Sequence, residues 1–428
     1  MRLGGRLAAA IDILHDIETR HRPAAEAMRD WGLNHRFAGA GDRAAIGNIV
    51  YDGLRRRSAA GWLFDADTPR ALAFGGYMLE NGMAPEAVNQ ALAEDRFAPP
   101  PLDEAELRAL AARLGTPLPE AARANIPEWC RPVAVRAFGA AWVEECAALA
   151  ARPPLDMRAN SLKASREKVL AALACAGAAA SAIASCGMRI PPVAGDGRHP
   201  HVQAEPAFHK GWFEVQDEGS QIVSELAGAE PGFQVLDFCA GAGGKTLAMA
   251  AMMENRGQVH AHDADRQRLA PIFDRLKRAG CRNVQVLADE AALAPLEGRM
   301  DLVVVDAPCT GSGTWRRRPD AKWRLTPQQL EARQGEQTAI LDAASRYVRP
   351  GGRLVYITCS FFEEENADQA HAFLARNPAF RACDHQAIWQ ERFPDHPQAV
   401  HIRREAGIML TPASAGTDGF YFAAFERR

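Results

Sequence analysis

Two cysteines stand at the ends of apolar, β-branched runs that are typical of buried strands. Cys309 comes shortly after the run Asp301–Asp306, and Cys359 directly follows the run Arg353–Thr358. If both runs are parallel strands of one open sheet, their carboxyl ends open onto one crevice, where such sheets bind ligands. Two thiols and the carboxylate of Asp306 would then meet in one pocket. This grouping indicates covalent chemistry on an electrophilic ring.

A glycine-rich turn from Asp237 to Thr246 follows a third apolar run and opens a predicted helix. Small residues let the backbone approach a ligand closely, and a helix N-terminus favours negative charge. The end of the turn, Gly244-Lys245-Thr246, fits the end of an NTPase P-loop, and Asp306 could serve as that site's acid. However, the first glycine of a P-loop should fall at position 239, which is cysteine. The NTPase interpretation therefore has weak support.

The same turn also fits an S-adenosylmethionine site. Asp263 ends the next predicted strand and would hydrogen-bond the ribose hydroxyls, as acids do in dinucleotide folds. Asp289, just past the strand after that, would lie near the adenine edge. Each aspartate alone could equally be the N-cap of the following helix. Because acids stand at three successive strand ends, the cofactor interpretation is favoured.

The elements that must position these residues fall into three parts. Residues 1–145 carry apolar residues at three- and four-residue spacing, which indicates helices. Residues 146–225 mix short strands and helices, as in a small α+β unit. In residues 226–428, strands alternate with helices, which indicates an α/β fold with a parallel, doubly wound sheet. The last strand, within Gly419–Phe425, is expected to be antiparallel.

Composition places the chain among ordinary globular proteins, because 47% of residues are apolar and 24% charged. The cysteines include no Cys-x-x-Cys pair, so neither a metal site nor a disulfide framework is indicated, and free thiols fit a cytoplasmic protein. No window reaches the ~18 consecutive apolar residues of a membrane span. A net charge of -3 does not suggest a nucleic-acid binder, so any such role depends on local patches.

Two basic stretches are candidates for such a patch. The run Arg55–Arg57 ends a predicted helix and is better explained as a solvated helix C-terminus. The second stretch follows Cys309 and combines cations with aromatic rings, which phosphate contacts and base stacking require. A solvated basic loop is the alternative. The candidate RNA-contacting residues are Arg316, Arg317, Arg318, Lys322, Trp323 and Arg324.

Residues 155–428 resemble the Sun/RsmB-type RNA (cytosine-5) methyltransferases. The glycine-rich turn is close to that family's C-A-A-P-G-G-K-T, with Gly241 and Ala242 in place of Ala-Pro. Two cysteine-bearing groups are specific to the family: Asp306–Cys309 with Gly311–Gly313 and Pro319–Arg324, and Thr358–Ser360 with Glu364–Asn366. Residues 1–145 resemble the NusB-like RNA-binding domain of the same enzymes, through Gly41–Arg43 and Val50–Arg57.

The resemblance implies a Rossmann-like class I methyltransferase that methylates C5 of cytosine in RNA with S-adenosylmethionine, with small-subunit ribosomal RNA favoured over tRNA. It assigns Cys359 as the nucleophile that adds to C6 and Cys309 to product release. Asp306 would hold the N3/N4 edge of the cytosine, assisted by Lys245. The cofactor-binding residues that it implies are Cys239, Ala240, Gly241, Ala242, Gly243, Gly244, Lys245, Asp263, Asp289 and Asp306.

Several alternatives stay open. DNA cytosine-5 methyltransferases use the cysteine of a Pro-Cys motif, which would make Cys309 the nucleophile. The substrate could be tRNA, or the chain could be a non-catalytic RNA-binding factor in ribosome assembly, an idea supported only by the Gly241-Ala242 replacement. We expect a monomer with no metal and no membrane partner. The remaining thiols, such as Cys175, Cys281 and Cys383, are expected to be packing or surface residues.

Overall fold

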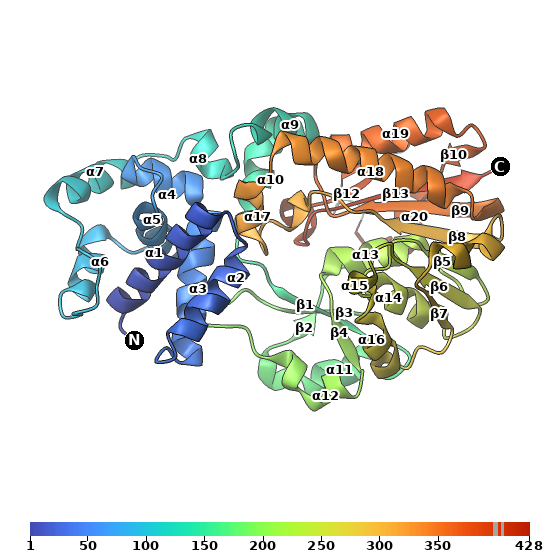
Figure 1. The fold of residues 1–428 in the computed structure, drawn as a ribbon, viewed down its shortest axis with the longest axis horizontal. Coiled ribbons are helices and arrows are strands. Elements are labelled where there is room, and N and C mark those ends of the chain that lie inside the picture. The colour runs from blue at the N-terminus through green and yellow to red at the C-terminus, as the bar shows by residue number, and fades with distance from the viewer. Residues whose placement is uncertain (397–400, 404–405) are drawn as a thin grey trace. The chain divides into compact units, whose positions relative to one another are not determined.

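The computed structural model describes residues 1–396, 401–403 and 406–428, which form two compact units (Figure 1). The helical unit comprises residues 1–153, 192–199 and 315–325, and the sheet unit comprises residues 154–191, 200–314 and 326–428. The predicted boundaries near residues 145 and 225 stay predictions. The two later segments of the helical unit are not indicated by the sequence.

Amphipathic helices build the helical unit, as the apolar spacing predicts. The apolar stripes of the first and third helices, with Leu14 and Ile49, pack in one buried core. The third and fifth helices approach closely where a Cβ on Gly76 would lie 2.6 Å from the backbone of Gly53. The helices are α1 Leu3–Arg20, α2 Ala24–Asn34, α3 Ala40–Arg55, α4 Arg57–Phe64, α5 Pro69–Asn81, α6 Pro85–Leu92, α7 Glu104–Leu114, α8 Glu120–Ala124, α9 Cys130–Phe138, α10 Trp142–Ala148 and, from the third segment, α17 Pro319–Arg324.

A small antiparallel sheet begins the sheet unit. Its strands run in the order β2-β3-β1-β4, and its first helix is capped by Ser165, whose hydroxyl accepts a hydrogen bond from the Lys168 N–H at 3.3 Å. The elements are β1 Leu155–Ala159, α11 Arg166–Ala172, β2 Ala179–Ala180, β3 Gly187–Ile190, α12 Pro206–His209 and β4 Phe213–Val215.

The main sheet runs in the order β11-β12-β13-β9-β8-β5-β6-β7. Strands β9, β8, β5, β6 and β7 are parallel, and β13 pairs antiparallel with β9, so the predicted doubly wound α/β sheet is confirmed. The strands are β5 Gln234–Asp237, β6 Gln258–His262, β7 Val284–Leu287, β8 Met300–Asp306, β9 Val348–Thr358, β10 Phe380–Ala382, β11 His401–Arg403, β12 Gly407–Leu410 and β13 Phe420–Arg427.

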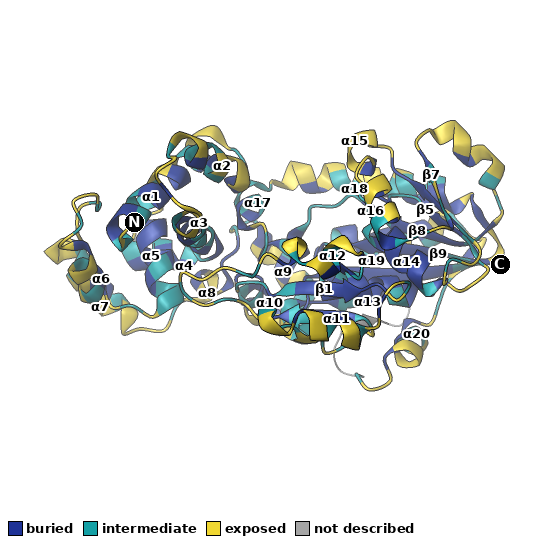
Figure 2. Cartoon of the chain, turned by 90° about the horizontal axis from the view of Figure 1, so that it is seen from below, coloured by how far each residue is buried: buried dark blue, intermediate teal, exposed yellow. Residues whose placement is uncertain are grey.

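Helices cover both faces of this sheet, because neighbouring strand residues point to opposite sides. Val235 packs in a core with α13, α14 and α20, whereas Leu236 packs in a core with α18 and α19. Figure 2 shows β5, β8 and the second half of β9 mostly in the dark blue of buried residues. The helices are α13 Glu218–Ala227, α14 Gly244–Met252, α15 Arg266–Leu269, α16 Ile272–Ala279, α18 Pro327–Ser345, α19 Ala367–Arg376, α20 His385–Arg392 and α21 Pro412–Ala415.

The connection between β6 and β7 forms two short helices in place of one long helix. Helices α15 and α16 are divided at Pro271. Proline has no N–H to donate to the preceding turn, so it ends one helix and precedes the next.

Candidate active site

The strands β5, β6, β8 and β9 end at one edge of the main sheet. Asp237 ends β5, Asp263 follows β6, Asp306 ends β8 and Cys359 follows β9. Strand β5 pairs in parallel with both β6 and β8, so the chain crosses over in opposite directions on either side of it. This switch point is where open α/β sheets bind ligands.

The two predicted thiols lie together at this edge. The Sγ atoms of Cys309 and Cys359 are 3.4 Å apart, which is within hydrogen-bond distance for sulfur. The hydrogen bond to Cys359 and then burial raise the pKa of the Cys309 thiol well above its usual value. Cys309 therefore keeps its proton at neutral pH, and either sulfur can donate the hydrogen bond between the two side chains.

Lys245 and Asp306 form an ion pair at the same edge. The Lys245 Nζ, at the start of α14, lies 2.6 Å from Asp306 Oδ2. The Lys245 ammonium also lies 5.4 Å from the ring centre of Phe420. The Lys245 side chain is 8% exposed, but that of Asp306 is 34% exposed, so the carboxylate can still meet a ligand.

The glycine-rich turn lies between β5 and α14 and includes Cys239, Ala240, Gly241, Ala242, Gly243 and Gly244. Gly243 is the N-cap of α14 with φ +84°, and a Cβ there would lie 2.5 Å from Ile272 Cγ1. Gly241 also has a positive φ, +50°, a backbone conformation that glycine adopts without strain. The Gly241 N–H donates to Asp263 Oδ2 at 2.8 Å, so the buried Asp263 carboxylate supports the turn.

Asp237, the last residue of β5, indicates what kind of cofactor would fit the turn. The hydroxyl of Thr246 donates to Asp237 Oδ2 at 2.6 Å, but Oδ1 is buried with no hydrogen-bond partner among the residues that the structure describes. Burial raises the pKa of this carboxyl to about 7. With Asp263 it gives the turn a lining of acceptors, which fits a ligand that carries hydroxyl groups and positive charge.

Asp289 lies apart from these buried acids. Its side chain is 65% exposed and pairs with Arg266, so in this structure its carboxylate is engaged at the surface. Cys239 packs against the core beneath α18 and α19, and burial raises the pKa of its thiol well above the usual value. It is therefore a packing residue of the turn rather than a third reactive thiol.

Residues without an assigned role hold the two cysteine loops. Glu365 is fully buried and accepts hydrogen bonds from the backbone and hydroxyl of Thr310, at 2.8 and 2.5 Å. Asn366 accepts from the Thr358 hydroxyl at 2.6 Å and donates to the Ser360 carbonyl at 2.9 Å, on either side of Cys359. The sequence signal was the Glu364–Asn366 motif, which the resemblance includes without giving it a function.

The stretch expected to contact RNA is largely packed within the helical unit. The Lys322 Nζ donates to the Arg55 carbonyl at 3.2 Å, and Trp323 Nε1 donates to the Leu54 carbonyl at 2.6 Å, so both cap the C-terminus of α3. Lys322 is 1% exposed and Arg316 is 4% exposed. The expectation that these two side chains reach RNA does not agree with their burial. Arg318 is exposed, and Arg317, Trp323 and Arg324 are partly exposed.

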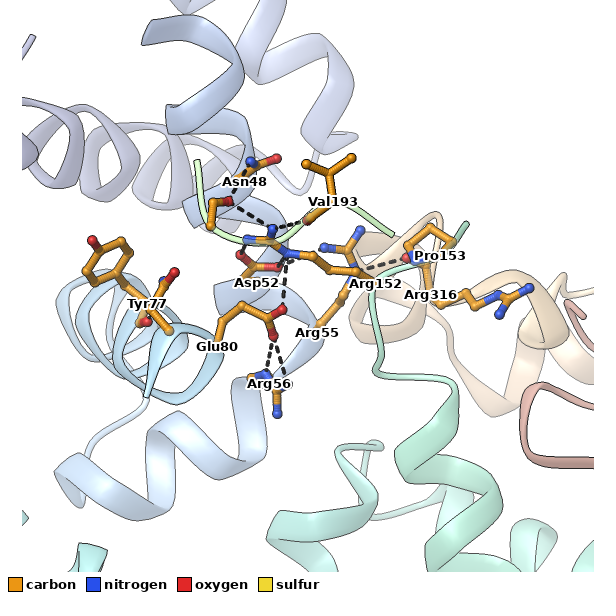
Figure 3. Close-up of polar contacts among 12 residues, drawn as sticks. Asn48, Asp52, Arg55, Arg56, Tyr77, Glu80, Arg152, Pro153, Val193 and Arg316 are labelled. Atoms are coloured by element: carbon orange, nitrogen blue, oxygen red, sulfur yellow. Dashed lines mark hydrogen bonds and ion pairs between the residues drawn. The ribbon is translucent and has the colours of Figure 1, made fainter. Parts of the chain in front are cut away.

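The run Arg55–Arg57 is also not a solvated helix end. Figure 3 shows Arg55 and Arg152 directed at Asp52, and Arg152 and Arg56 directed at Glu80. Arg57 pairs with Glu18 and Asp67. Each arginine of the run therefore pairs with an acid. These acids lie in another turn of α3 or elsewhere in the helical unit, and folding brings them next to the run.

No group of histidine, cysteine and acidic side chains in the described chain could hold a metal ion. None of the described helices is long and apolar enough to cross a membrane.

Comparisons with known proteins agree with the geometry of the sheet unit. The family model "16S rRNA methyltransferase RsmB/F" matches residues 225–426, and the ferredoxin-like domain model of the RsmF/B-like methyltransferases matches residues 126–190. The crystal structure of NSun6 from Pyrococcus horikoshii with SFG, an analogue of S-adenosylmethionine, superposes with a TM-score of 0.60 at 22% identity. The superposition covers 70% of this chain and 98% of that one and shows a shared fold.

Two curated relatives extend the match. The probable ribosomal RNA small subunit methyltransferase B of Synechocystis sp. is 31% identical over 312 residues, 71% of this chain and 67% of that protein. The ribosomal RNA small subunit methyltransferase B of Pseudomonas syringae pv. tomato is 33% identical over 301 residues, 69% of this chain and 64% of that protein. The match therefore spans about two thirds of the length of each relative.

Proposed function

The chain belongs to the RsmB/F family of rRNA methyltransferases, and we propose that it methylates C5 of a cytosine in small-subunit ribosomal RNA, with S-adenosylmethionine as the methyl donor. The observation that carries this proposal is the pair of thiols, 3.4 Å apart, at the strand edge that also holds the Lys245–Asp306 pair. Covalent activation of a pyrimidine ring needs this combination of a nucleophile, a proton carrier and a fixed acid.

Cys359 is the nucleophile in this proposal. C5 of cytosine is too weakly nucleophilic to take a methyl group unaided. The Cys359 thiolate adds to C6, forming an S–C6 bond, and the displaced electron pair makes C5 nucleophilic. Asp306, held by Lys245, binds the N3/N4 edge, where a hydrogen-bonded or protonated ring is a better electrophile.

Cys309 then completes the cycle. After C5 carries a methyl group, the C5 proton must leave and the S–C6 bond must break. The electron pair of the C5–H bond re-forms the C5–C6 double bond, and the pair of the S–C6 bond returns to the Cys359 sulfur. Cys309 donates its proton to this departing sulfur and accepts the C5 proton in exchange. Both thiols end protonated, and loss of one proton to solvent restores the starting pair.

The cofactor would lie over the glycine-rich turn. When bound, S-adenosylmethionine supplies an electrophilic methyl group. Asp263 would hold the ribose hydroxyls with the lone pairs that its backbone bonds leave free. The unpartnered Asp237 Oδ1 favours a positively charged ligand above it. The exposed Asp289 would bind the adenine edge in place of Arg266.

The RNA would meet the exposed cations of the 315–325 segment. Arg318 is exposed and Arg317 and Arg324 are partly so, and cations in such positions bind phosphates. The target base must leave any stack to reach a thiol at the sheet edge. Because the net charge is -3, these local cations have to supply the attraction.

Methyl transfer from labelled S-adenosylmethionine to unmodified small-subunit rRNA tests the proposal, with a tRNA pool in parallel and Cys359→Ala as control. We expect label as 5-methylcytosine in rRNA, lost in the variant. Label in tRNA alone would keep the chemistry and discard the substrate. Cofactor binding without transfer to either RNA would favour a non-catalytic assembly factor. Family membership leaves the NTPase interpretation without support, and a cytoplasmic monomer stays a prediction.

A further inference from the structure

Glu365 is a buried carboxylate beside the loop that carries Cys309. It lies in the short turn Glu363–Glu365 after β9 and has no solvent exposure. Its Oε1 accepts from the Thr310 N–H at 2.8 Å and from Gln337 Nε2 at 3.0 Å, and its Oε2 accepts from the Thr310 hydroxyl at 2.5 Å. All of these partners donate, so they match an ionised carboxylate, although burial raises the pKa of this group.

The same network fixes the backbone on both sides of Cys309. Gln337 Nε2, on α18, also donates to the Pro308 carbonyl at 3.0 Å. Pro308 is therefore tied to Gln337, and Thr310 is tied to Glu365. With both neighbours held, the backbone of Cys309 is fixed where its Sγ lies 3.4 Å from Cys359 Sγ.

We propose that Glu365 is a positioning residue that holds the Cys309 loop against Cys359 and fits Cys309 for proton transfer, which leaves the attack on the base to Cys359. The inference rests on the proposed function, since it divides the roles of nucleophile and proton carrier between the two thiols. Glu365 acts in two ways that reinforce each other: it holds Cys309 against Cys359, and it places a negative charge near the Cys309 sulfur.

The other titratable groups around Cys309 do not replace this effect. Cys359 approaches from the end of β9 and makes the sulfur–sulfur hydrogen bond. Tyr356, also on β9, donates its hydroxyl to the Glu365 carbonyl at 2.6 Å, and burial raises its pKa well above the usual value, so it stays neutral. Asp306, at the end of β8, is paired with Lys245. Glu365 is therefore the unneutralised charge of this group.

The pH dependence of thiol alkylation tests the proposal without RNA or cofactor. The parent, Glu365→Gln and Thr310→Val would be treated with iodoacetamide between pH 6 and 10, and the peptides of each cysteine quantified by mass spectrometry. Glu365→Gln removes the negative charge of residue 365. It also places a side-chain N–H donor against the N–H or hydroxyl of Thr310, which are donors themselves. A fall of about one unit in the pKa of Cys309 raises its alkylation rate at pH 7.5 about tenfold. Thr310→Val, which loses one of the hydrogen bonds to Glu365 and keeps the charge, should give a smaller rise.

Glu336→Gln is the matched control, because Glu336 precedes Gln337 on α18 but is 48% exposed and paired with Arg333. It should leave Cys309 alkylation unchanged. An unchanged Cys309 rate in a folded Glu365→Gln variant would overturn the proposal; if that variant unfolds, an unchanged rate in Thr310→Val would do so. Methyl transfer by the parent is measured separately. A parent that transfers no methyl group while Cys309 still responds would overturn the proposed function and support the positioning role.

Discussion

At the scale of residues, the active site separates two chemically identical thiols by their surroundings. Cys309 follows β8 on a loop tied to Glu365 and Gln337, whereas Cys359 follows β9 directly. Hydrogen bonding and burial raise the pKa of Cys309, so its thiol keeps its proton at neutral pH. Two cysteines in different surroundings can divide nucleophilic attack and proton transfer between them.

The buried Asp237 predicts a pH dependence of stability. Its pKa is about 7 in the folded protein, against ~3.9 for an unfolded aspartate. Between these values the folded state holds the extra proton, so the free energy of unfolding falls as pH rises and the loss is complete above pH 7. Asp237→Asn removes this loss, so it should match the parent near pH 4 and exceed it at pH 8 by roughly 2–4 kcal/mol.

Urea unfolding of the cofactor-free protein at both pH values checks this expectation. The exposed Asp274 supplies a control, because Asp274→Asn should change stability little and equally at both pH values. A difference between Asp237→Asn and the parent that does not vary with pH would contradict the expectation.

At the scale of elements, hydrogen bonds to the ends of two helices hold the 315–325 segment to the rest of the helical unit. Lys322 and Trp323 donate to the last carbonyls of α3, and the Asp320 carboxylate accepts from the Ala24 N–H at the start of α2. Arg55 returns a hydrogen bond to the Arg316 carbonyl at 2.9 Å. A motif rich in cations and aromatic rings, which the sequence favours as an RNA surface, therefore serves in large part to join this segment to the helical unit.

The ion pairs around Asp52 hold the 192–199 segment in a similar way. Arg152 contacts Asp52 at 2.6 Å and donates to the Val193 carbonyl at 2.7 Å, and Arg55 lies 3.0 Å from the same carboxylate. The Asp52 side chain is 3% exposed. Asp52→Asn removes the acid that pairs with the buried Arg55 and one of the two acids that pair with Arg152, which should cost about 3–5 kcal/mol of unfolding free energy.

Urea unfolding, with hydrogen exchange of the α3 amides to locate the effect, checks the Asp52 prediction. The matched change is Asp67→Asn, which breaks an ion pair with Arg57 at a carboxylate that is 58% exposed and should cost below about 1 kcal/mol. Equal costs for the two substitutions would show that the Asp52 cluster does not stabilise the unit.

At the scale of the whole molecule, the sequence predicts the features that depend on local patterns. It does not predict the contacts between residues that lie far apart along the chain. The parallel strands and the thiols at their ends follow from apolar runs and local motifs, and the structure has them. Glu365 and Gln337 hold the Cys309 loop from distant positions, and no periodicity reveals such partners. The burial of Lys322 also cannot be predicted from the sequence. The residues around a lysine do not distinguish one in a surface loop from one that caps a helix of another segment.

The central claim is that Cys359, and not Cys309, bonds to the cytosine. The direct measurement is trapping with small-subunit rRNA that contains 5-fluorocytosine, in the presence of S-adenosylmethionine, followed by identification of the RNA-linked peptide by mass spectrometry. Fluorine at C5 cannot leave as the proton does, so the adduct persists. We expect the link at Cys359 in the parent and in Cys309→Ala, and none in Cys359→Ala. A link at Cys309 in Cys359→Ala, or no link in the parent, would contradict the claim.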